Sequence, residues 1–178
     1  MKVRLATRTD IPALKHLIHE SVRGLSATYY SPQQIESALQ HVFGVDTQLI
    51  NDETYFIAED ETQIAGAGGW SKRKTVFGGD QSKSSRVDSL LEPSSEPARI
   101  RAFYIHPGWS RRGIGSLLLQ ACEDAARAAG FRRVELASTL PGVPFYLSRG
   151  YEKHEEIPIN MKDGELLVTI RMSKTLGS

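Results

Sequence analysis

The sequence has 178 residues, of which 40% are hydrophobic and 24% are charged, and its formal net charge is +1. This length suits one domain with a substantial core, and the near-zero net charge excludes a global field for nucleic acid or anionic membranes. Cys122 is the only cysteine, so neither an internal disulfide nor a cysteine metal cluster can form. No apolar run has the length of a membrane span, and no apolar signal-peptide core is seen. We therefore expect a cytoplasmic protein with no nucleic-acid or membrane partner.

The first part of the chain predicts a strand and two helices. Residues 2–7, KVRLAT, alternate as a strand does. Residues 7–22 predict a helix opened by Thr9 or Asp10, with Pro12 early in it. A second helix is expected from Ser31 to Gly44, with a capping box formed by Ser31 and Gln34.

The remaining chain predicts six strands and two helices. Residues 54–59 and 62–70 read as a hairpin around a tight turn, and residues 78–96 as a long loop insertion. A strand at 98–106, a helix, a strand at 132–138, a short helix at 143–150 and a strand pair at 151–159 and 166–174 follow. With no linker or repeat, this order predicts a single mixed α/β domain over residues 1–178.

One stretch of the sequence indicates a ligand-binding site. The helix after the strand at 98–106 begins on Gly113-Ile114-Gly115, directly after Arg111 and Arg112. Glycine is a poor helix former, and positive charge at a helix N-terminus is unfavourable. Free amides at that end would bind a phosphate or pyrophosphate, which glycine would allow to approach closely. The alternative is a glycine-permitted turn with two solvated arginines.

The apolar positions of this helix include Ile114, Leu117, Leu118, Ala121, Ala125 and Ala128, and Glu123 falls on the polar face. Gly130 is placed to end the helix as a left-handed cap. A P-loop is excluded because its motif is missing, and a dinucleotide fingerprint would need a third glycine where Leu118 stands.

Two segments carry a family resemblance. The stretch RIRAFYIHPGWSRRGIGSLLLQACEDAARAAGF resembles the acetyl-CoA-binding motif of the GNAT superfamily of N-acetyltransferases, and STLPGVPFYLSRGYE resembles the segment before that family's last strands. The resemblance implies a GNAT-like α/β fold, with a central, mostly antiparallel mixed sheet that contains a splayed strand pair and has helices on both faces. It also implies transfer of an acetyl group from acetyl-CoA to a primary amine, without a metal, and it makes a homodimer plausible. The acceptor amine stays open: it could belong to a small molecule, such as an amino acid or an antibiotic, or to a protein.

The resemblance also implies residue roles. Backbone groups of Phe103, Tyr104 and Ile105 would pair with the pantetheine arm. The amides from the start of the helix would hold the pyrophosphate: Arg111, Arg112, Gly113, Ile114, Gly115 and Ser116. The family pattern usually has Gln or Arg where Ser110 stands, so one side-chain contact is missing, and Arg111 or Arg112 could replace it.

The resemblance also implies which residues act in catalysis and which line the acceptor pocket. Tyr146 matches the family tyrosine that protonates the departing thiolate, and the alternative is that it only packs against Phe145. No carboxylate lies on the strand at 98–106, so the base is unassigned, with Glu135, Asp80, His106 and Glu96 as candidates. The acceptor pocket is expected at Tyr29, Tyr30 and Trp70, where an aromatic lining would suit an apolar or cationic amine. The alternative for the two tyrosines is a half-buried loop position.

The sequence also offers candidates for a metal site and a reactive cysteine. The HLIHE segment at residues 16–20 lacks a zinc-site pattern and is best explained as a solvated helix face, and Cys122 as a core residue. Two non-enzyme functions remain open: an acyl-CoA-binding or sensor module on the same fold, and an anion-binding regulatory or protein-interaction domain.

Overall fold

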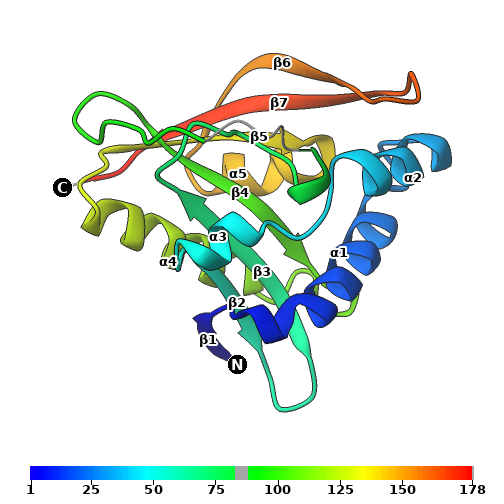
Figure 1. The fold of residues 1–178 in the computed structure, drawn as a ribbon, viewed down its shortest axis with the longest axis horizontal. Helices are drawn as coiled ribbons and strands as arrows, with labels where there is room; N and C mark the ends of the chain where they lie inside the picture. Colours follow the sequence, from blue (N-terminus) through cyan, green and yellow to red (C-terminus); the bar gives the residue numbers. More distant parts are fainter. Residues whose placement is uncertain (83–87, 178) are drawn as a thin grey trace.

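A seven-stranded sheet forms the centre of the protein (Figure 1). The computed structural model describes residues 1–82 and 88–177. The strand order is β1-β2-β3-β4-β5-β7-β6, and all neighbours are antiparallel except the parallel pair β4 and β5. The strands are β1 (Lys2–Leu5), β2 (Tyr55–Glu59), β3 (Ile64–Ser71), β4 (Ala98–Ile105), β5 (Arg133–Thr139), β6 (Glu152–Asn160) and β7 (Leu166–Thr175).

Helices cover both faces of the sheet. They are α1 (Ile11–Ser26), α2 (Pro32–His41), α3 (Thr47–Asn51), α4 (Ile114–Ala128) and α5 (Val143–Ser148). Buried residues of α1, α2 and α3 form one core with Tyr55 and Ile57 of β2, while α4 packs with Ala58 of the same strand on the opposite face. The strand's side-chain alternation therefore supplies both cores. The predicted mixed α/β architecture, with a mostly antiparallel sheet and helices on both faces, is confirmed.

The capping signals in the sequence correctly predicted where α2 begins. In α2, Ser31 Oγ accepts from the Gln34 N–H at 3.1 Å and Gln34 Oε1 accepts from the Ser31 N–H at 2.9 Å, as the capping box predicts. The helix ends at His41, before the expected Gly44, and the short helix α3 was not predicted. In α1, a 3-10 turn precedes the helix, which continues to Ser26.

The predicted buried face of α4 was correct at Ile114 and Leu118 and wrong at three other positions. Leu117 is 44% exposed, whereas Glu123 is buried. The carboxylate tolerates burial because Lys174 donates to it at 2.8 Å and Tyr151 donates to it at 3.0 Å. Ala128 is exposed, and the buried positions of the helix are Ile114, Leu118, Leu119, Cys122, Glu123 and Ala126. Cys122 is a core residue, as expected, and Gly130 has the positive φ of a left-handed cap.

The segment predicted as a long loop at 78–96 is partly anchored where the structure describes it. A 3-10 turn spans Asp80–Ser82, Leu91 is buried, and Asp88 accepts from the Thr75 N–H at 3.0 Å. Residues 83–87 of that prediction lie outside the described part. Within residues 1–82 and 88–177, no helix has the length and apolar character needed to cross a bilayer.

Arg4 ties the N-terminal strand to the rest of the fold. Its guanidinium donates to both oxygens of Asp10 and to both oxygens of Glu59. The hydrogen bonds from Arg4, together with those from Thr7, lower the pKa of Asp10 to about 2.

We expect Asp10→Asn to lower the free energy of unfolding by about 1–2 kcal/mol at pH 7, because hydrogen bonds to a charged group are lost. Asp10 has a lower pKa in the folded state, so its contribution is full above about pH 4 and is lost as the pH falls toward about 2. Urea unfolding from pH 7 to pH 2 should therefore show a shallower decline in the variant. Glu36→Gln is the control, since the pair of Glu36 with Arg23 is exposed on both sides and should matter little. Equal losses in the two variants would contradict this assignment.

Candidate active site

The sheet opens between β4 and β5 (Figure 1). These strands pair only at Ala98 with Val134 and at Arg99 with Glu135, while β5 remains paired with β7 as far as Thr139. Beyond Arg99, β4 therefore leaves its parallel neighbour and the two strands form the sides of a cleft.

A β-bulge in β4 accompanies this separation. Ala67 faces Tyr104 and Gly69 faces Arg101, so three steps along β4 oppose two along β3. Ala102 lies within the bulge with φ of 54°, a left-handed conformation that non-glycine residues rarely adopt. The bulge changes the direction of β4 where the cleft begins.

The cleft has a volume of about 760 Å³. Most of the residues predicted to bind cofactor or substrate line it, although they come from four separate segments of the chain. These lining residues are Tyr29, Phe103, Tyr104, Ile105, Arg111, Gly113, Ile114, Gly115, Ser116 and Tyr146.

Three predicted site residues lie elsewhere. Arg112 lies over the Trp109 ring, 5.3 Å from its centroid, and does not line the cleft. Tyr30 is buried, donates to Val168 O at 2.7 Å and accepts from the Leu140 N–H at 2.9 Å. Trp70 is buried and packs edge-on against Phe131. The structure thus gives Tyr30 and Trp70 core positions, and of the three predicted acceptor residues only Tyr29 reaches the cleft.

The start of α4 presents unpaired backbone donors. Within residues 1–82 and 88–177, the amides from Arg111 to Ser116 donate no hydrogen bond. Arg111 and Gly113 both have positive φ, 64° and 83°, so the chain curves around these amides before the helix begins. Consecutive amides in such a conformation form a concave anion site.

The two glycines serve different purposes. A Cβ on Gly113 would meet nothing within 4 Å, so the space before this residue is open. A Cβ on Gly115 would come within 3.2 Å of the Phe145 ring, so this glycine allows α5 to pack closely on α4. Gly113 therefore suits close approach of a ligand, whereas Gly115 is explained by packing.

The backbone of β4 carries another donor, which sequence analysis did not connect to α1. The Ile105 N–H donates to Ser21 Oγ at 3.1 Å, whereas the His106 N–H donates to Ala65 O on the β3 side. Alternation along the strand directs the Phe103 N–H to the same side as that of Ile105, toward the cleft. Ser21 lines the cleft, and the only sequence signal for it was a serine within an apolar helix face.

Arg149 is a second functional candidate that sequence analysis missed. It follows α5, is exposed and lines the cleft together with Arg111. No local pattern marks it, because its position depends on how α5 packs against α4.

Tyr146 lies at the bottom of the cleft among aromatic rings. Its ring centroid is 5.1 Å from that of Phe145, 5.3 Å from that of Tyr151 and 6.2 Å from that of Phe103, all edge-on. Burial raises the pKa of Tyr146 above its usual value, so the phenol stays protonated at neutral pH. Packing and a proton-donor role are therefore compatible at this residue.

None of the four candidate bases lines the cleft. Glu135 accepts from Arg99 at 2.9 Å and from Arg171 at 3.1 Å. Asp80 accepts from the Thr47 N–H, His106 Nδ1 from the Gly108 N–H, and Glu96 from the Glu92 N–H. Each of the four therefore has a hydrogen-bond partner of its own outside the lining.

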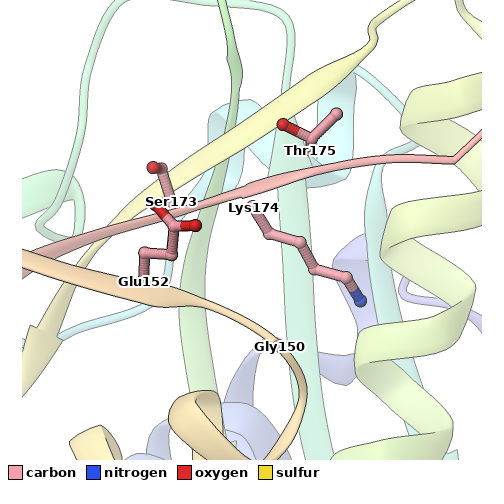
Figure 2. Close-up of a pocket in the computed structure, with 5 residues that line it drawn as sticks. All are labelled: Gly150, Glu152, Ser173, Lys174 and Thr175. Carbon is pink, nitrogen blue, oxygen red and sulfur yellow. The ribbon is translucent and has the colours of Figure 1, made fainter.

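A second hollow, of about 240 Å³, lies between the start of β6 and the end of β7 (Figure 2). It is lined by Gly150, Glu152, Ser173, Lys174 and Thr175. The ammonium group of Lys174 is held by the buried Glu123, so this small polar hollow does not offer a comparable set of free donors.

Comparison with known proteins identifies the family. The profile described as the acetyltransferase (GNAT) family matches residues 18–151. The chain belongs to the GNAT acetyltransferase family. The predictions of the family, of its fold and of an acetyltransferase enzyme are thereby confirmed.

Solved structures agree with this fold. A GCN5-related N-acetyltransferase from Rhodopseudomonas palustris superposes with a TM-score of 0.72 at 20% identity, covering 98% of this chain and 95% of that one. The PaiA N-acetyltransferase from Thermoplasma acidophilum, solved in complex with coenzyme A, gives 0.65 at 16% identity and covers 98% of both chains. YncA from Salmonella typhimurium, solved with acetyl-CoA, gives 0.64 at 16% identity, covering 100% of this chain and 95% of its own. No match was found among curated protein sequences.

We expect Gly113→Ala to weaken coenzyme A binding by at least about tenfold, or about 1.4 kcal/mol, because the added methyl group occupies the open space before the free amides. Isothermal titration calorimetry measures this. Gly164→Ala is a matched control: Gly164 has φ of 90°, its Cβ would also meet nothing within 4 Å, and it does not line the cleft.

Both variants should lose about 1 kcal/mol of stability from the left-handed conformation, and only Gly113→Ala should lose affinity. Unchanged affinity in Gly113→Ala would show that coenzyme A is held elsewhere.

Proposed function

We propose that this protein transfers the acetyl group of acetyl-CoA to a primary amine, by direct attack within the cleft between β4 and β5. The observation that carries the proposal is the run of free amides from Arg111 to Ser116 at the mouth of α4. Those donors fit a diphosphate, and they open into the same cleft as Tyr146.

The chain's own groups divide into two sets for this task. Amides 111–116, with Arg111 and Arg149, would hold the anionic end of acetyl-CoA, and the cleft-facing backbone of Phe103 would pair with its extended arm. Acetyl-CoA supplies the thioester. A backbone N–H of β4, next to the bulge at Ala102, would polarise the carbonyl oxygen of the thioester.

Tyr146 would supply the proton that the departing sulfur needs. A buried phenol with a raised pKa is protonated throughout the neutral range, so it is ready to donate. Its aromatic neighbours fix the ring, and this reduces the freedom lost when the reacting groups align.

One observation favours a second function. Because no carboxylate or imidazole among residues 1–82 and 88–177 lines the cleft, the fold could bind acyl-CoA as a sensor without turnover. Release of free thiol in the presence of acetyl-CoA and an amine panel distinguishes the two functions. Tight binding of coenzyme A without thiol release would favour the sensor.

Tyr146→Phe should lower kcat by about 10²-fold, within the range for a lost general acid, and should leave the Kd for coenzyme A within about twofold of wild type, because the ring remains. Steady-state kinetics and calorimetry on the same preparations measure both. Tyr151→Phe is the control, since Tyr151 is a buried neighbour that does not line the cleft and should affect stability more than rate. An unaltered kcat in Tyr146→Phe would remove this residue from the mechanism.

A further inference from the structure

The acceptor end of the cleft is aromatic and apolar. Tyr29 after α1, Phe43 after α2 and Phe77 after β3 line it together with Tyr104 of β4. Phe43 and Tyr104 pack edge-on, with ring centroids 6.3 Å apart. This part of the wall favours a ligand with an apolar body.

In the part of the chain that the structure describes, the ionisable side chains that line the cleft are of two kinds. They are the arginines Arg101, Arg111 and Arg149 and the tyrosines Tyr29, Tyr104 and Tyr146. Among residues 1–82 and 88–177, no aspartate, glutamate or histidine lines the cleft, and by sequence residues 83–87 contain none. An ammonium group entering the cleft would therefore find no lining counter-charge.

Arg101 and its partners provide no counter-charge for a cation at the acceptor end. Its side chain is 1% exposed, with Nε 3.0 Å from Asp46 and Nη1 3.6 Å from Asp88, and Nη1 donates to Thr75 O at 2.7 Å. These two carboxylates contact the guanidinium and are not part of the lining. Because both carboxylates are paired with Arg101, neither is offered to an approaching ammonium group, and removal from water favours the neutral form of the amine.

We propose that the acceptor is a single amine on an apolar, aromatic-bearing body, and that it reacts as the free base. This inference rests on the proposed acetyl transfer and names its substrate class. It disfavours polycationic acceptors, because each of their ammonium groups would lose hydration without gaining a partner.

The proton balance of the step needs no separate base. The neutral nitrogen forms a bond to the thioester carbonyl carbon, the carbon–sulfur bond breaks, and the sulfur takes a proton from Tyr146. The proton that the nitrogen then loses restores the phenol. The products are one amide and one thiol, and no external acid, base or oxidant is consumed.

The test compares two amines of similar shape and different basicity on the full-length protein with saturating acetyl-CoA. Phenylalaninamide carries an α-amine with a pKa of about 8, and 2-phenylethylamine is an alkylamine with a pKa of about 10. Thiol release is followed from about pH 6 to about pH 9.5. We expect log(kcat/KM) to rise with unit slope and to level off near pH 8 for the first amine, while continuing to rise for the second. At pH 7 the first should be favoured by about 100-fold, according to its free-base fraction.

Spermidine serves as the polycationic probe and should be a poorer acceptor than either amine. Tyr29→Ala should raise the KM for both aromatic amines severalfold without changing the KM for acetyl-CoA. Leu166→Ala removes an exposed apolar side chain of β7 outside the cleft and should change neither.

A break at the same pH for both amines would reveal a protein base and overturn the inference. Preference for spermidine would overturn it too. If coenzyme A binds and none of the three amines is acetylated, the inference fails while the cofactor site stands. If coenzyme A does not bind, the proposed function fails with it.

Discussion

The early end of the β4–β5 ladder is the constraint on which the rest of the site depends. Backbone groups that leave a ladder need other partners. Here Ser21 of α1 accepts the Ile105 N–H, and the bulge at Ala102 changes the direction of the strand. Because β5 stays paired with β7, the sheet opens without losing its second half. Because the two strands separate, polar backbone groups of β4 face a cleft between the helices of both faces of the sheet. A continuous sheet would not allow this.

Features governed by nearby residues could be predicted from the sequence. The capping box of Ser31 and Gln34 and the left-handed cap at Gly130 depend on a few consecutive residues, so the pattern was sufficient. The buried face of α4 could not be predicted in the same way. Glu123 is buried because Lys174, 51 positions later, neutralises it, and no local periodicity contains that pairing.

The same distinction applies to the site. The backbone donors at the N-terminus of α4 could be predicted because Gly113 and Gly115 mark that backbone geometry in the sequence. Tyr146 could be predicted because it belongs to a segment with a recognisable pattern. Tyr30 and Trp70 were expected at the acceptor end and lie in the core, since the burial of an aromatic depends on which elements close over it. Ser21 and Arg149 were missed because they reach the cleft only through the packing of α1 on β4 and of α5 on α4.

Charge distribution connects the two ends of the cleft. The protein is almost neutral as a whole, yet its cleft is lined by arginines and by no carboxylate in the described residues. Many of its carboxylates form ion pairs outside the cleft. Glu135, for example, pairs with both Arg99 and Arg171 on the neighbouring strands. With carboxylates paired outside the cleft, Arg111 and Arg149 contribute positive charge at the N-terminus of α4 without raising the net charge, and they attract an anionic carrier there. At the aromatic end, an amine leaves water without gaining a lining carboxylate, which favours a nucleophile that has already lost its proton. One charge pattern thus accounts for both ligands.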